Sequence, residues 1–597
     1  MKKQLLTALI GAAILSGNTA IASDSKSFYR GGADNKIVTA TNGAKVNKEY
    51  NDFMTKGVFA GAKITEVTDG VWTVSGYSLA NYTFIEGKTG LIAFDSGSSV
   101  GMGKTVLEMV QKKVNKPVVA LIYSHFHYTG GAKAYAASNP SGKIDIYAHP
   151  GVEKNMGGQG STFRDAQNRR AGIQLGAYLP HSGPDAAFGP AEPQFKDAKL
   201  SAHGHLAATH EVKDGEKVNI DGIDFTFYHA VADTEDSLIV DIPSKDLVLH
   251  NSASAGMLFS LYTLRGSDYR TPVPMINSLD KVRSLNRKYV VGVHDFPTEG
   301  EKAQEILTAH RDAYAFIYNQ SVRAINKGAT PDEMAASIKL PTHLDQHAQL
   351  YPGYVDNEYN VRAQYRGIIG WFDEDISELH PPSRNELGRE LLAVSGGADK
   401  LISAAKKAFA DKKYNLSVKL YSIVVDAEPA NKTAKLGMAA ALRQMAQTTR
   451  AGIQTRSYLL THALHLEGKL DINKQPKFKF FGSESTAEIM ASAPGTSVKA
   501  LEMKLDPNQV LDVESVVAVT FTDLDKSFSI NIRKGAIEVS EGADKAEATL
   551  EIKRETWAKL AIGEASLKQL ISSKQANIKG SKDMAYKVLG AFDNIEL

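Results

Sequence analysis

The sequence predicts an α/β layered domain, followed by a helical region and a small α+β domain. Short, almost wholly apolar runs at residues 90–95 and 117–123 flank a helical segment at about 102–113. This order of strand, helix and strand is typical of a layered α/β domain. Apolar residues recur at helical spacing after Pro297, and strand-like alternation returns after residue 516. These three patterns together predict the fold class.

The first domain begins where the chain changes from a polar, mixed leader to alternating apolar residues, near Val67. Residues 70–74 and 81–86 are predicted strands, and Gly87 ends the second of them. Further strands are expected near residues 143–147, 216–219, 224–228, 238–241, 247–249 and 289–293.

The helical region opens with a long segment at 301–327 that stops at Gly328. Capping boxes at Thr330–Glu333 and Ser383–Glu386 mark two more helix starts. Residues 398–447 resemble three short amphipathic helices of a helix-hairpin array, a surface that usually serves self-association. The last domain is expected to contain strands at 516–521, 527–532, 536–539 and 548–552, and helices at 555–562, 566–573 and 582–589.

The composition excludes several classes of function. The 597 residues carry 69 basic and 67 acidic side chains, a net charge of +2, with no long basic run. Nucleic-acid binding is therefore not expected, because phosphate contacts need clustered Lys and Arg. Cysteine is absent, which rules out disulfides, thiolate catalysis, zinc fingers and iron–sulfur clusters. Any metal must be bound by His, Asp or Glu.

The first residues have the pattern of a secretory signal. Lys2 and Lys3 precede a short apolar run at 5–15, and Ala20-Ile21-Ala22 has the form of a cleavage site. A retained anchor is the alternative. No later apolar run of about 20 residues is found, so stable membrane insertion is not expected. We expect export, most simply to a bacterial periplasm.

A histidine pair carries the chemistry. His125 and His127 follow the apolar strand that ends at Tyr123, and Gly130-Gly131 permits a tight turn after them. In an extended turn both imidazoles point to the same side, where they suit one zinc ion. Two unrelated loop histidines are the alternative, but the preceding buried strand and Asp95 favour a site.

These motifs resemble the metallo-β-lactamase fold, and more closely its alkylsulfatase branch. The matching stretches are residues 79–87, Arg169-Arg170, residues 261–266 and His294 to Pro297. The resemblance implies an αββα sandwich, an all-α helical dimerisation domain and a small sterol-carrier-like α+β domain. The expected order is signal peptide 1–22, leader 23–55, catalytic domain 56–300, helical dimerisation domain 301–450, linker 451–479 and lipid-binding domain 480–597.

The metal motif departs from that family. The family motif is His-x-His-x-Asp-His-x-Gly-Gly, whereas here only Tyr128 and Thr129 separate the histidine pair from the glycines. By spacing, two later family glutamates fall on Asp233 and Ser252, and His294 alone remains of the other ligands of the second zinc. We therefore predict one zinc ion per chain, held by His125, His127 and Asp233 with an open fourth position. His250 and Asp236 are possible substitute ligands.

The resemblance implies a zinc-dependent hydrolase of alkyl sulfate esters that forms a homodimer. By resemblance Arg265 binds the sulfate group, with Tyr262 beside it, and the last domain holds the alkyl tail. Our own inference is that His294 acts as general acid or base. The plainer alternatives are a loop-capping Asp233, a backbone-bonded His294 and a surface Arg265. The rival functions are an amphiphile-binding protein of the periplasm that does not turn over, and a hydrolase of another ester.

Overall fold

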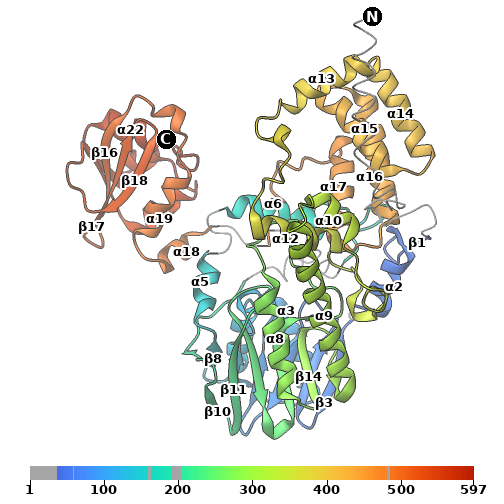
Figure 1. Ribbon diagram of the computed structural model, residues 1–597. Helices are drawn as coiled ribbons and strands as arrows, with labels where there is room; N and C mark the ends of the chain where they lie inside the picture. Colours follow the sequence, from blue (N-terminus) through green and yellow to red (C-terminus); the bar gives the residue numbers. More distant parts are fainter. Residues whose placement is uncertain (1–35, 58, 159–162, 190–202, 478, 481–483) are drawn as a thin grey trace, which may run out of the picture. The chain divides into compact units, whose positions relative to one another are not determined.

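The computed structural model describes residues 36–57, 59–158, 163–189, 203–477, 479–480 and 484–597 (Figure 1). The chain divides into two compact units, residues 1–157 with 165–480 and residues 158–164 with 481–597. The predicted signal peptide, residues 1–22, lies outside the described residues. The described part of the predicted leader forms β1 (Ile37–Thr39), β2 (Lys45–Asn47) and most of α2 (Lys48–Lys56), which pack on the first unit through Val46 and Tyr50.

Two β-sheets form the centre of the first unit (Figure 1). The seven-stranded sheet follows chain order; its strands are antiparallel up to β6 and parallel afterwards. It consists of β3 (Lys63–Thr68), β4 (Val71–Ser75), β5 (Tyr82–Glu86), β6 (Leu91–Phe94), β7 (Val118–Ile122), β8 (Asp145–Ala148) and β9 (His210–Glu211). The six-stranded sheet consists of β10 (Lys217–Ile220), β11 (Ile223–Ala230), β12 (Ser237–Ile242), β13 (Leu247–Ala255), β14 (Tyr289–His294) and β15 (Thr298–Glu299).

Three apolar clusters show how the layers stack. Ile122 of the first sheet and Leu238 of the second belong to one cluster, which lies between the sheets. The outer face of the first sheet packs against α3 (Val100–Gln111) and α4 (Ala132–Ser138), and that of the second against α8 (Pro272–Leu285) and α9 (Gly300–Ile325). This is the αββα sandwich that was expected.

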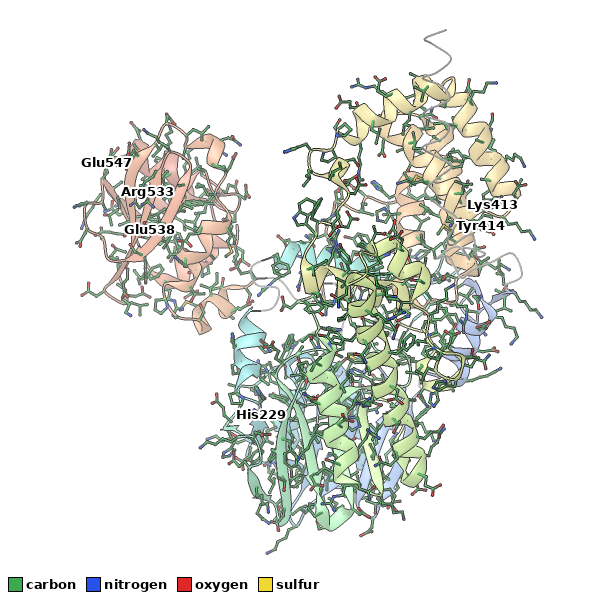
Figure 2. The ribbon with its side chains drawn as sticks, viewed as in Figure 1. His229, Lys413, Tyr414, Arg533, Glu538 and Glu547 are labelled. Atoms are coloured by element: carbon green, nitrogen blue, oxygen red, sulfur yellow. The ribbon has the colours of Figure 1, made fainter. Side chains whose placement is uncertain are left out.

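The helical region continues beyond the sandwich within the same unit. The three predicted amphipathic helices are confirmed as α14 (Ala398–Ala410), α15 (Tyr414–Ala427) and α16 (Lys432–Thr448), with Lys413 and Tyr414 at the turn into α15 (Figure 2). The stretch predicted as a linker contains α17 (Ile453–Leu466), which packs on α16 through Ala463 and Leu442. Among the described residues, no helix has both the length and the apolar character needed to cross a bilayer.

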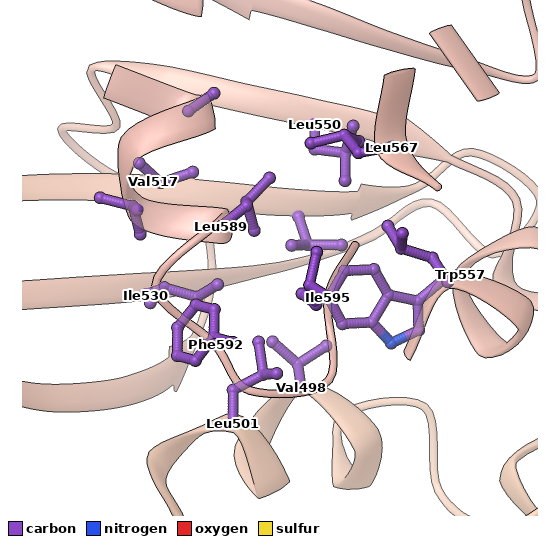
Figure 3. Packing of buried hydrophobic residues seen from close by; sticks show 14 of the residues in the cluster. Val498, Leu501, Val517, Ile530, Leu550, Trp557, Leu567, Leu589, Phe592 and Ile595 are labelled. Carbon is purple, nitrogen blue, oxygen red and sulfur yellow. The ribbon is translucent and has the colours of Figure 1, made fainter. Parts of the chain in front are cut away.

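The second unit is a small α+β fold. Its sheet has the strand order β18-β17-β16-β19-β20, and β16 pairs in parallel with β19. Trp557, Phe592 and Ile595 pack in its core (Figure 3), and Arg533 pairs with Glu538 across neighbouring strands at 2.9 Å (Figure 2). The strands are β16 (Glu514–Phe521), β17 (Lys526–Arg533), β18 (Ala536–Glu541), β19 (Ala548–Ile552) and β20 (Ala576–Gly580), of which β20 was not predicted. The predicted helices are α20 (Arg554–Ala561) and α21 (Leu567–Ser572), which precede β20, and α22 (Lys582–Leu589), which follows it.

Candidate metal centre

Three ligand-type side chains converge where β7 and β11 end. His125 Nε2 lies 3.0 Å from His127 Nδ1 and 3.3 Å from Asp233 Oδ2, and the distance from His127 Nδ1 to Asp233 Oδ2 is 2.9 Å. In a tetrahedral site with metal–ligand bonds of about 2.0–2.1 Å, neighbouring ligand atoms lie roughly 3.3 Å apart. The three groups therefore fit around one metal ion.

A hydrogen-bonded chain orients the first histidine. Ser124 donates from Oγ to Asp95 Oδ2 at 2.6 Å and from its backbone N–H to Oδ1 at 2.8 Å. Because that hydroxyl proton is used, His125 Nδ1, 2.8 Å from Ser124 Oγ, must be the donor between them. Nε2 of His125 then presents its lone pair to the triad. Asp95 adopts a left-handed φ of 65°, which turns the chain after β6 so that the carboxylate reaches Ser124.

The aspartate of the triad is held as an anion. Its Oδ1 accepts a hydrogen bond of 3.0 Å from Asn251 Nδ2 on β13. Burial alone would raise the pKa of Asp233, but His125 and His127 outweigh burial and hold this pKa well below its usual range. Burial lowers the pKa of His127 to about 4 despite Asp233. A charged carboxylate beside a neutral imidazole is the donor set that a divalent cation requires.

His294 lies at the end of β14, outside the triad. Its Nδ1 is 2.7 Å from the carbonyl oxygen of Leu79, which can only accept, so Nδ1 carries the proton and Nε2 has the lone pair. The side chain is buried, and this burial lowers the pKa of His294. His250 Nδ1 bonds to Ser252 Oγ at 2.9 Å, and neither residue belongs to the triad. The alternative ligand Asp236 also stays outside the triad.

Arg265 stands on a loop that α6 (Arg164–Leu175) holds in place. Its backbone N–H donates to Gln174 Oε1 at 2.7 Å, and its carbonyl accepts from Arg170 Nε at 2.7 Å. The positive charge of the guanidinium influences the triad, because, together with burial, it lowers the pKa of His127. The Tyr262 carbonyl accepts from Ser260 Oγ; in the described part of the chain its side chain makes no recorded contact with the triad.

Two further groups near the triad were not predicted from the sequence. Arg270 donates from a terminal nitrogen to the carbonyl oxygen of Ser260 at 2.6 Å, and its buried Nε has no hydrogen-bond partner among the described residues. Burial lowers the pKa of Arg270, and the negative charge of Asp233 opposes this shift. The Tyr354 hydroxyl accepts a hydrogen bond of 3.0 Å from Gln174 Nε2. Burial raises the pKa of this phenol, and the charges of Arg265 and Arg270 oppose the shift.

Comparisons with known proteins agree with this architecture. Residues 330–469 match the family model for alkyl sulfatase dimerisation, and residues 483–597 match that for the alkyl sulfatase C-terminal domain. A linear primary-alkylsulfatase of Pseudomonas sp. (strain ATCC 19151) is 29% identical over 510 residues, which cover 83% of this chain and 94% of that protein. An alkyl/aryl-sulfatase of Saccharomyces cerevisiae is 25% identical, with 89% and 82% covered.

The solved structure of a stereoselective inverting sec-alkylsulfatase from Pseudomonas sp. shares the fold. Its TM-score is 0.77 at 22% identity, with 99% of this chain and 97% of that chain covered. The sandwich and its triad define an αββα protein with a candidate metal site, followed by a helical region that matches the alkyl sulfatase dimerisation model and by an α+β domain. The chain is thus similar to alkylsulfatases over most of its length and carries two domains that match alkyl sulfatase family models.

Proposed function

We propose that this chain is a metal-dependent hydrolase that cleaves alkyl sulfate esters to an alcohol and sulfate. The observation that carries the proposal is the triad of His125, His127 and Asp233, with the guanidinium groups of Arg265 and Arg270 acting on it. A metal site with fixed cations beside it suits an anionic ester, because the cations offset the charge that repels a nucleophile. The names of the relatives support this substrate class.

The metal is proposed to be zinc, one ion per chain. Two imidazoles and one carboxylate with an open fourth position are the ligands of a common type of catalytic zinc site. When bound, zinc supplies Lewis acidity and lowers the pKa of a water molecule towards 7. Asp95 and Ser124 would support this ion indirectly, since they fix the orientation and protonation of the His125 ring.

The chain's own residues bind the substrate and handle protons. Arg265 is proposed to grip the sulfate oxygens through its planar fork, and Arg270, whose Nε is unpartnered among the described residues, to contribute a second cation. His294 Nε2 carries a lone pair and is proposed to accept a proton during the reaction. Tyr262, three residues before Arg265 in the sequence, is proposed to contact the substrate.

The other regions are proposed to bind the tail and a second chain. The helical region is proposed to form a homodimer, as the name of its family model implies. The C-terminal unit is proposed to be sterol-carrier-like and to bind the alkyl tail, because each buried methylene contributes about 0.8 kcal/mol. Exposed apolar side chains on this unit, Met503 at 56% and Leu511 at 58%, are candidate contacts.

Export to the periplasm is also proposed. Lys2, Lys3, the apolar run at 5–15 and the Ala20-Ile21-Ala22 triplet support it. N-terminal sequencing of protein recovered from a periplasmic extract should give Ser23 as the first residue. A chain that retains Met1 in the cytoplasmic fraction would contradict this proposal.

The central test is sulfate release from dodecyl sulfate, together with zinc analysis of the purified full-length protein. We expect activity and about one zinc per chain. Treatment with a chelator should abolish activity, and zinc should restore it. His127→Ala should lose both zinc and activity, whereas His343→Ala, an exposed histidine of the helical region, should retain both. A zinc-loaded wild-type protein that releases no sulfate would refute the hydrolase proposal.

A further inference from the structure

Tyr128 occupies an unusual place in the candidate metal centre. It ends the short 3-10 turn Phe126–Tyr128 that carries the histidine pair, and its side chain is 8% exposed. Its ring centroid lies 5.1 Å from that of His125 and 5.5 Å from that of His294, edge-on in both cases. Among the described residues His125 and His294 make no ring contact with each other, whereas the tyrosine ring contacts both.

The hydroxyl of Tyr128 has no hydrogen-bond partner among the residues that the structure describes. The ring is buried, but the hydroxyl oxygen is not one of the fully buried unpartnered atoms of the described chain, so a bound group can reach it. Burial raises the pKa of this phenol, and the negative charge of Asp233 and the phenol of Tyr354 raise it further. The phenol therefore lies within the electrostatic surroundings of the Asp233 carboxylate, beside the triad histidine that its ring contacts.

His294 supplies a second unsatisfied group in the same place. Its Nδ1 is used by Leu79, and within the described chain its Nε2 has no recorded partner although the side chain is only 8% exposed. A phenol O–H can donate, and an imidazole lone pair can accept. Two unpartnered polar atoms of complementary character, both on buried side chains beside a three-ligand site, indicate that a bound polar group completes them.

We propose that Tyr128 takes the place of a second metal ion: its ring contacts both His125 and His294, and its hydroxyl donates a hydrogen bond to the sulfate group of the substrate. This inference rests on the proposed function, because it assumes an anionic ester at the triad. It explains how the pocket can bind an anion without the aspartate and the histidine that the family motif places after the histidine pair. The phenol is a neutral donor, so it contributes a hydrogen bond without placing a further charge beside the single metal ion.

The experiment compares Tyr128→Phe with Tyr135→Phe in the zinc-loaded full-length protein. Tyr135 is a matched control, since it is fully buried with an unpartnered hydroxyl but packs between α4 and the outer face of the first sheet. Two quantities are measured: zinc equivalents per chain by mass spectrometry, and the dissociation constant of inorganic sulfate by calorimetry. Wild type should bind one zinc. Tyr128→Phe should still bind one zinc and should weaken sulfate binding about tenfold or more, as expected for a lost hydrogen bond to an anion.

Three outcomes of the comparison would overturn the inference, and a fourth follows them. They are unchanged sulfate affinity in Tyr128→Phe, an equal loss of affinity in Tyr135→Phe, or two zinc equivalents in wild type. Loss of zinc from Tyr128→Phe would make the phenol a ligand and would also overturn it. Hydrolysis of dodecyl sulfate by wild type is assayed separately: its absence, with sulfate affinity still dependent on Tyr128, would refute the proposed hydrolase function alone.

Discussion

The carboxylate of Asp236 accepts a hydrogen bond of 2.9 Å from the backbone N–H of Phe126. Phe126 lies between the two triad histidines, whereas Asp236 directly precedes β12 of the other sheet. A second bond of 2.9 Å, from Asn155 Nδ2, fixes the same carboxylate. The second sheet therefore positions the turn on which the first sheet presents its metal ligands.

Removing this contact should weaken metal binding. Asp236→Ala leaves the Phe126 N–H and the Asn155 amide without a buried acceptor, so the turn loses its fixed geometry. We expect zinc affinity to fall by about 10- to 100-fold, the usual effect of losing a supporting contact behind a ligand. Competition with a chromophoric chelator measures this. Asp224→Ala, at an exposed position near the start of β11, should bind zinc like wild type; equal loss in both variants would refute the assignment.

Neutralising either arginine should impair catalysis on anionic esters. Arg265→Gln and Arg270→Gln each remove a charge beside the triad, and we expect kcat/KM for dodecyl sulfate to fall about 100-fold, or about 2.7 kcal/mol of transition-state binding. Arg265→Lys should recover only part of this, because lysine lacks the bidentate fork. Arg283→Gln, in a half-exposed pair with Asp280, is the control. Steady-state rates unaffected by Arg265→Gln would contradict sulfate binding there.

Stability should decrease between acidic and neutral pH because of Glu358. Burial, and then the charge of Asp356, raise the pKa of Glu358 to about 7, above an unfolded value of about 4.3. The folded chain therefore binds more protons between these values, and the free energy of unfolding falls as the pH rises from about 4.3 to about 7. Glu358→Gln should remove this contribution and raise the melting temperature at pH 8. Exposed Glu390→Gln should not, and identical melting curves for wild type and Glu358→Gln at pH 8 would refute this prediction.

An exposed apolar stretch in the helical region is our candidate dimer contact. Trp371 is 64% exposed, Ile376 79% and Leu379 49%, and all three fall within the match to the alkylsulfatase dimerisation model. The double substitution of Trp371 and Ile376 by serine should convert the dimer to a monomer in light scattering. Leu511→Ser removes a comparable exposed side chain from the C-terminal unit and should leave the dimer intact. A variant that stays dimeric at micromolar concentration would exclude this surface.

The histidine pair and the aspartate could be found from the sequence because each has a local signature. His125 and His127 follow a buried strand directly, and Asp233 lies at a spacing set by the resemblance. Arg270 and Tyr354 have no such signature. Gln174 bonds to the Arg265 backbone and to the Tyr354 hydroxyl, 91 and 180 residues away from it in sequence, contacts that only the folded chain reveals.

The secondary structure shows the same limit. Most strands of both sheets were predictable, since buried strands are largely apolar, whereas the polar and more exposed strands β3, β9 and β15 were missed. Helix α8 was missed because Pro272 and Pro274 lie in its first turn, where proline is tolerated although it resembles a loop signal. Helix α17 was missed because its buried face includes polar side chains, among them Gln454 and Arg456, which find their partners Leu264 and Ala186 only after folding.

Tyr354 comes from the helical region, yet Arg265 and Arg270 of the sandwich act on its phenol. A protein truncated after residue 300 would retain the three ligand-bearing side chains and lose this phenol. Transplanting the sandwich alone into another scaffold would therefore carry over the capacity to bind an ion without the group that interacts with its two arginines.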